Sequence, residues 1–182
     1  MGIHPADFSW KLESEESFYT PEAVLTFSAE GLGKMTRNFH DFYRNHLIRS
    51  KYRNQKRPIL INNWEATYFD FDKEKILNIA KGASELGVEM LVLDDGWFGK
   101  RDDDLAGLGD WTVNEKKLGM PLSQVAEKIR GLGMKFGIWI EPEMANTTSE
   151  LYEKHPEWVL KAPNREIVLG RGGTQVVLDL SN

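Results

Sequence analysis

Residues 91–99 read Leu-Val-Leu-Asp-Asp-Gly-Trp-Phe-Gly, an apolar run of strand length that ends abruptly in two carboxylates, a glycine and two aromatic side chains. The same design recurs in Ile59–Glu65 and in Phe136–Glu143, where each apolar run ends in a tryptophan with an amide or an acid. Carboxylates accept hydrogen bonds from neighbouring hydroxyl groups, and aromatic faces stack on the apolar face of a sugar ring. The repeated pattern therefore predicts a sugar-binding mouth at the ends of buried strands.

From Pro58 onward, short apolar segments alternate with amphipathic ones, as expected for strands that alternate with helices. This order implies an α/β fold with a parallel sheet, in which about four strand–helix units would form the first half of a (β/α)8 TIM barrel. Polar residues gather after the strands, on the side that carries function in such barrels. The expected strands are 59–62, 90–93, 135–140 and 176–180, and the expected helices are 72–86, 123–132 and 148–160, with a long covering loop over 96–118.

Residues 1–57 have a different pattern and are predicted to form a separate part of the chain, distinct from 58–182. Phe8–Leu12 and Ala23–Ser28 alternate apolar and polar residues, which predicts two antiparallel strands. Apolar residues at helical spacing predict a helix over 34–50, followed by a basic linker.

The composition excludes several classes of function. The chain has 182 residues, a net charge of −5 and no cysteine, and a complete barrel of this type typically takes about 250 residues. The modest charge gives no reason to expect a nucleic-acid or membrane partner, and without cysteine there is no disulfide, thiolate or zinc–sulfur chemistry. We found no secretory signal and no apolar run of about 20 residues, so a cytoplasmic protein is expected.

The acidic residues after the second and third strands are the first candidates for chemistry. Asp94 and Asp95 are interpreted as hydroxyl-binding or acid/base groups, against the alternative that one caps a turn and the other is solvated. Glu141 and Glu143 could form a glycosidase pair, whose carboxyls lie about 5 to 9 Å apart, or could orient neighbouring groups. A divalent ion between Asp94, Asp95 and Glu141 is a weaker alternative. Because no histidine pair has metal-ligand spacing, a zinc hydrolase is not expected, and the preferred interpretation involves no cofactor.

Aromatic and basic residues supply the remaining candidates. Trp64 and Trp139 lie at strand ends among polar residues, where a role in a ligand pocket and a role in the core are about equally supported. Trp111 lies in the covering loop and could close over a ligand. Arg171 follows a glycine in a glycine-rich stretch that could aim its guanidinium into the mouth, or it could be a surface arginine.

Six motifs in this order resemble bacterial α-galactosidases of glycoside hydrolase family 36. They are Asn62–Ala66, Leu93–Gly99, Leu108–Trp111, Trp139–Met144, His155–Trp158 and Val177–Ser181. The resemblance covers most of residues 58–182. Residues 1–57 are similar to the end of that family's N-terminal β-sandwich domain and its linking helix.

The resemblance implies a (β/α)8 enzyme that hydrolyses terminal α-1,6-linked galactose from melibiose and raffinose with retention of anomeric configuration. In this family two aspartates act, one as nucleophile and one as acid/base, and the full-length enzymes often form tetramers. By motif, Asp94 and Asp95 match the pair that binds the galactose O4 and O6 hydroxyls. Trp64 and Trp139 match aromatic residues that line the pocket, and Arg171 matches a pocket arginine.

The chain departs from the family pattern in two ways. The family usually reads Gly-Arg-Asn-Gln before the fourth strand, whereas residues 170–175 read Gly-Arg-Gly-Gly-Thr-Gln. The Lys-Trp-Asp motif that carries the nucleophile does not occur among the 182 residues, so the resemblance assigns the catalytic pair beyond Asn182 and predicts an inactive chain. A non-catalytic half-barrel that binds sugars or self-associates is an alternative, and so is a different enzyme that uses Asp94 with Glu141.

Overall fold

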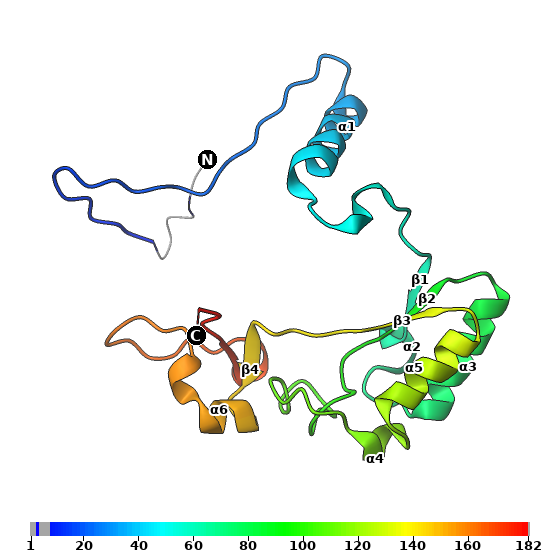
Figure 1. The fold of residues 1–182 in the computed structure, drawn as a ribbon. Helices are drawn as coiled ribbons and strands as arrows, with labels where there is room; N and C mark the ends of the chain where they lie inside the picture. Colours follow the sequence, from blue (N-terminus) through cyan, green and yellow to red (C-terminus); the bar gives the residue numbers. More distant parts are fainter. Residues whose placement is uncertain (1–2, 4–7, 182) are drawn as a thin grey trace. The chain divides into compact units, whose positions relative to one another are not determined.

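The computed structural model describes residue 3 and residues 8–181. The chain divides into two compact units, Met1–Arg57 and Pro58–Asn182, and Figure 1 traces both. None of the helices in the described part is long and apolar enough to cross a membrane.

The first unit is built on one helix. α1 spans Leu32–Phe42 and continues as a π-helical turn, Tyr43–Leu47, before a short 3-10 turn over Lys51–Asn54. The helix predicted over 34–50 is therefore confirmed, with an earlier end. Gly31 precedes it with φ +82°, a backbone conformation that glycine adopts without strain.

The two strands predicted in the first unit are wrong. Residues 8–12 and 23–28 have no regular secondary structure, and the apolar side chain of Phe27 is 85% exposed. An alternating pattern forms a strand only where another strand pairs with it, because the backbone groups must find hydrogen-bond partners. Within the described residues of this unit, no such partner strand is present.

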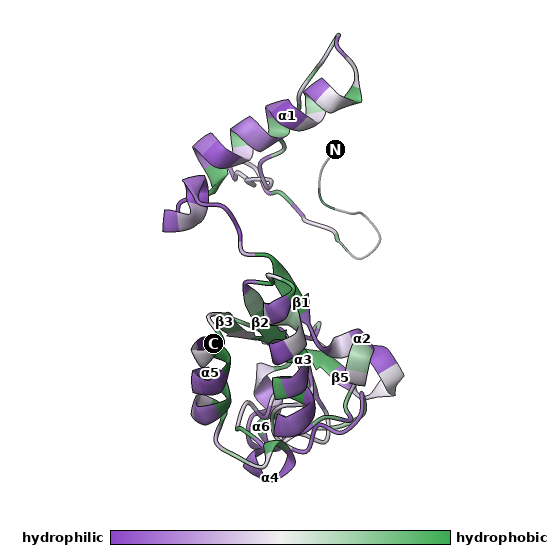
Figure 2. Cartoon of the chain, turned by 90° about the vertical axis from the view of Figure 1, so that its right-hand side faces the viewer, coloured by the Kyte–Doolittle hydropathy of each residue, from purple (hydrophilic) through white to green (hydrophobic). Residues whose placement is uncertain are grey.

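A three-stranded parallel sheet organises the second unit. β1 (Leu60–Asn62), β2 (Met90–Leu93) and β3 (Lys135–Ile138) lie in the order β1-β2-β3, with Asn62 opposite Val92 and Leu93 opposite Ile138. Figure 2 shows these strands among the most hydrophobic parts of the chain. The predicted strands 59–62, 90–93 and 135–140 are thus confirmed, except that the first begins at Leu60 and the third ends at Ile138.

Two helices cover the sheet and explain its buried face. α3 (Lys73–Glu85) and α5 (Leu122–Gly131) pack against each other and against the strands (Figure 1). Asp72 caps α3 by accepting a hydrogen bond from the backbone N–H of Lys75 at 2.9 Å. The shared core consists of small and branched side chains, chiefly Ile76, Ala80, Ala83, Leu91, Leu93, Val125 and Ile129.

A strand is present where the fourth was predicted, over 176–180, but its predicted parallel pairing is wrong. β5 (Gln175–Val177) does not extend the parallel sheet but pairs antiparallel with β4 (Met144–Asn146), which the sequence pattern did not predict. The reason is a second small core: Ala145 and Val176 are fully buried together with Val159. β4 begins at Met144, shortly after β3 ends at Ile138, and β5 pairs with β4 instead of with β3.

The remaining segments are short. The predicted helix 148–160 is broken into α6 (Glu150–Lys154) and a 3-10 turn at Pro156–Trp158, because proline has no N–H to continue the helix. The long loop after β2 contains α4 (Glu115–Leu118), and α2 (Trp64–Thr67) follows β1 directly.

Candidate functional site

The carboxyl ends of β1, β2 and β3 meet at one edge of the sheet, because the three strands are parallel. Trp64 follows β1, Asp94 follows β2 and Trp139 follows β3, each at or next to the end of its strand. The backbone N–H of Trp139 donates to the carbonyl of Leu93 at 2.8 Å, which continues the ladder up to the residue before Asp94. The residues predicted from three separate segments therefore lie at one edge.

Asp94 is held firmly while its side chain stays half-buried. Its carboxylate accepts hydrogen bonds from the side-chain amide of Asn62 and from the backbone N–H of Asp95. Its own N–H donates to Oδ1 of Asn63, which is fully buried, at 2.8 Å. A fixed and partly accessible carboxylate is suited to accept hydrogen bonds from ligand hydroxyls.

Asp95, the next residue, has a different environment. It is 5% exposed, and both of its oxygens accept from the guanidinium of Arg101, with Nε–Oδ1 3.0 Å and Nη2–Oδ2 2.8 Å. This two-pronged geometry is the strong form of a carboxylate–arginine pair. Arg101 itself is 1% exposed, so the pair is buried and its charges are compensated internally.

Arg101 and Asn146 are site residues that the sequence reasoning missed. Nη1 of Arg101 also donates to the carbonyl of Ala106 at 3.1 Å and to Oδ1 of Asn146 at 3.2 Å. Asn146 in turn accepts from the N–H of Leu108 and donates to Oγ1 of Thr174. The only signal was a lone arginine six residues after a strand-end acid, and the three aspartates that follow it made the segment resemble a solvated loop.

Trp139 belongs to an aromatic cluster over the strand ends. Its ring lies parallel to that of Phe98, with centroids 6.4 Å apart, and Phe98 packs on Trp111 at 4.4 Å. Nε1 of buried Trp97 donates to the carbonyl of Trp139 at 2.9 Å. Trp139 and Trp111 are both half-buried, so each combines packing within the cluster with a surface that a ligand can reach.

Trp64 lies in a smaller aromatic group. Its ring meets Tyr68 and Phe69 edge-to-face, with centroids 5.2 Å and 5.0 Å apart. Its backbone N–H donates to Oδ1 of Asn62, the residue whose amide holds Asp94. The position of Trp64 is thereby tied to the same edge as the acid.

Glu141 and Arg171 complete the charged groups of this region. Partial burial raises the pKa of the Glu141 carboxyl, and the nearby charge of Glu143 raises it further, while the positive charges of Arg171 and Arg101 act in the opposite direction. Nη1 of Arg171 lies 3.5 Å from Oδ1 of Asp104, and its side chain is 67% exposed. In the part of the chain that the structure describes, no group of acids or histidines is arranged to hold a metal ion.

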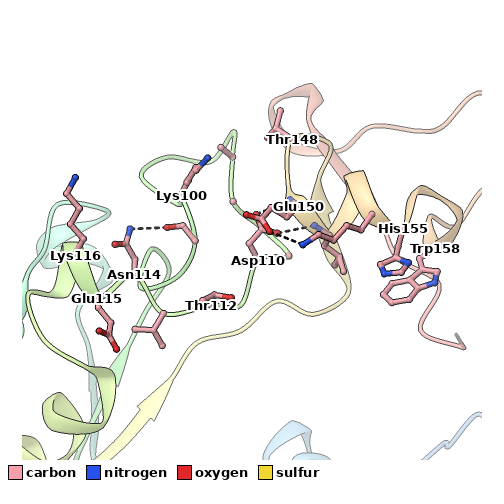
Figure 3. A pocket seen from close by; sticks show the side chains of 17 residues that line it. Lys100, Asp110, Thr112, Asn114, Glu115, Lys116, Thr148, Glu150, His155 and Trp158 are labelled. Atoms are coloured by element: carbon pink, nitrogen blue, oxygen red, sulfur yellow. Dashed lines mark hydrogen bonds and ion pairs between the residues drawn. The ribbon is translucent and has the colours of Figure 1, made fainter.

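A cavity of about 950 Å³ lies elsewhere, between the long loop after β2 and α6 (Figure 3). Asp110 stands at its centre, but its carboxylate accepts from the backbone N–H groups of Glu150 and Leu151 at 3.1 Å each and so caps α6. His155 stacks on Trp158 at one end. None of the residues predicted for the site lines this cavity, so we assign the candidate site to the strand ends.

Known proteins resemble this chain closely in sequence. The model of the Melibiase family matches residues 17–182, well over half of the chain. This chain belongs to the Melibiase family. It is 56% identical over 181 residues to α-galactosidase AgaA of Geobacillus stearothermophilus, covering 100% of this chain and 25% of that protein. It is 47% identical to α-galactosidase Mel36A of Lactobacillus acidophilus, covering 98% of this chain and 24% of that protein.

Solved structures of Melibiase-like enzymes agree with the fold. The crystal structure of AgaA, described as a glycoside hydrolase family 36 α-galactosidase, superposes with a TM-score of 0.87 at 55% identity and covers 100% of this chain and 25% of that one. A variant of the same enzyme was solved in complex with raffinose, with a TM-score of 0.86 at 54% identity and the same coverage. The chain therefore spans about a quarter of the length of the relatives that it matches.

Proposed function

We propose that this chain is part of a retaining α-galactosidase that removes terminal α-1,6-linked galactose from oligosaccharides such as melibiose and raffinose. The observation that carries the proposal is the fixed, half-buried carboxylate of Asp94 beside the strand-end tryptophans, in a chain of the Melibiase family. The relative solved with raffinose supports this class of substrate.

In this proposal, residues 58–182 contribute the first strands of a (β/α)8 barrel, and residues 1–57 contribute the end of a β-sandwich domain and its linking helix. Three parallel strands with their polar residues at one edge support the barrel. β5 pairs antiparallel with β4 in the structure. To become the fourth strand of the barrel, it would have to leave β4 and pair with β3.

The pocket residues have distinct roles in the proposal. Asp94 and Asp95 accept hydrogen bonds from the O4 and O6 hydroxyls of galactose. The different environments of the two acids support different roles for them. The side chain of Asp94 is partly exposed. Asp95 is buried and accepts from Arg101, and its carboxylate oxygens have further lone pairs that can accept a hydrogen bond. Trp64 and Trp139 form walls against the sugar ring, and Arg171 contributes a guanidinium at the rim.

The chain alone is not expected to catalyse hydrolysis. A retaining mechanism needs two carboxyls about 5 Å apart, one as nucleophile and one as acid/base. The carboxylate of Asp95 forms an ion pair with Arg101. The Lys-Trp-Asp motif that carries the family's nucleophile does not occur in these residues. We therefore assign galactose binding to this segment and leave the catalytic pair unassigned within it.

The test is hydrolysis of p-nitrophenyl α-galactoside by the chain alone, and then by the chain mixed with the separately produced carboxyl-terminal remainder of AgaA. Activity only in the mixture is the expected result. Turnover by the pure chain would overturn the assignment of roles and would favour the alternative in which Asp94 and Glu141 act together, since partial burial raises the pKa of Glu141, which is the direction that an acid catalyst needs.

A further inference from the structure

Four charged residues of alternating sign connect the end of β2 to the glycine-rich loop before β5. Asp95 pairs with Arg101 at 2.8 Å, and Nη2 of Arg101 lies 3.5 Å from Oδ1 of Asp104. The same oxygen of Asp104 lies 3.5 Å from Nη1 of Arg171. One carboxylate oxygen is thus shared by two guanidinium groups that would otherwise repel each other.

The loop that carries Arg171 is a short glycine-rich 3-10 turn over Arg171–Gly173. Gly172 and Gly173 have φ angles of +63° and +67°, and Gly170 precedes the arginine. Glycine adopts such conformations readily but leaves the backbone with more freedom than any other residue. Of the hydrogen bonds and ion pairs found for the Arg171 side chain in the described structure, the contact with Asp104 is the one that restrains it.

Both arginines act on the strand-end carboxyls. The positive charges of Arg171 and Arg101 both act to lower the pKa of Glu141, against the raising effects of its partial burial and of Glu143. A change in the position of Arg171 would therefore change the electrostatic potential at this edge of the sheet. Asp104 lies between the two arginines and is half-buried, with 42% of its side chain exposed.

We propose that Arg101 and Asp104 are positioning residues of the sugar pocket: Arg101 fixes the carboxylate of Asp95, and Asp104 holds Arg171 where its guanidinium can meet a bound galactose. The inference rests on the proposed function, because it assumes that this edge binds galactose. Neither residue needs to touch the sugar. Their effect is transmitted through the two groups that they hold.

The experiment is a titration of the full chain with D-galactose, in which tryptophan fluorescence reports binding. Asp104→Asn removes the shared charge and should weaken galactose binding roughly five- to tenfold, as expected for the loss of a charge-assisted contact. Asp103→Asn is the matched control, since Asp103 is an exposed neighbour whose carboxylate accepts from the backbone N–H of Leu105. It should bind galactose like the unmodified chain.

A second pair of variants separates positioning from a general effect on folding. If Asp104 acts through Arg171, the change Asp104→Asn should have no further effect on affinity once Arg171→Gln has been introduced. A purely structural role would lower affinity equally in both backgrounds, and that result would overturn the inference. Asp104→Glu, which keeps the charge, should recover part of the affinity.

The outcomes distinguish the two proposals. If the unmodified chain does not bind galactose, the proposed function fails and the inference fails with it. If the unmodified chain binds galactose and Asp104→Asn binds it equally well, the proposed function stands and the inference is wrong.

Discussion

Adjacent residues at the end of β2 have unequal surroundings. Asp94 is half-buried and held by neutral donors, whereas Asp95 is enclosed by the guanidinium of Arg101. We expect Asp94→Asn to reduce galactose affinity at least tenfold, because an amide replaces one acceptor oxygen with a donor. Isothermal titration with galactose measures the effect, and Glu85→Gln, at an exposed helix end, is the control that should change nothing. Equal binding by the Asp94 variant would remove this residue from the pocket.

Glu141 gives a prediction for the dependence of stability on pH. Its pKa in the folded chain lies above the ordinary value of 4.5, so the folded state binds the proton more tightly than the unfolded state does. Stability is then lost as pH rises from the unfolded pKa through the folded one. Glu141→Gln should be more stable relative to the unmodified chain at about pH 7 than at about pH 4, as measured by urea unfolding. A difference that is constant with pH would contradict this.

Among the elements, α3 offers the sharpest test of local stability. The carboxylate of Asp72 satisfies the N–H of Lys75 at the first turn, and replacing a capping aspartate by alanine typically costs about 1 kcal/mol. Asp72→Ala should lower the free energy of unfolding by that amount in a urea titration. Asp72→Asn keeps the acceptor and should be nearly neutral. If both variants are equally destabilised, the loss reflects the charge and not the cap.

The elements also show why sequence prediction succeeded in some places and failed in others. β2 was predicted at its observed bounds because an apolar run flanked by glycine and acid is a local signal. The pairing of β4 with β5 joins segments about thirty residues apart and depends on a small core around Val159, which no local pattern reports. Residues 8–12 and 23–28 had the alternation of strands, but the part of the chain that the structure describes offers them no partner strand.

For the site, the same distinction holds. Asp94, Trp64 and Trp139 could be predicted because each follows a strand, and parallel strands bring their ends to one edge. The role of Arg101 could not, since burial of a loop arginine depends on the loop folding back on Asp95. Loop closures of this kind are decided by tertiary contacts and leave no periodic signature in the sequence.

At the scale of the whole molecule, the parallel sheet has two free edges within the described residues. Among the residues that the structure describes, β1 and β3 each pair with β2 alone, and Leu60 and Ile138 are 50% and 40% exposed. Unpaired strand edges with apolar side chains favour association with other chains. We expect the isolated chain to self-associate with increasing concentration in sedimentation velocity. A single monomeric species across the concentration range would contradict this.

The buried guanidinium of Arg101 has a consequence for how the molecule opens. Lifting the long loop would leave the carboxylate of Asp95 enclosed without its counter-charge, and would also detach Asn146 and β4. An uncompensated buried charge is costly, so it is energetically unfavourable for the loop to separate by itself. The amide protons of the loop, of the end of β2 and of the β4–β5 pair should therefore exchange with solvent through one common opening event, with one shared free energy of opening.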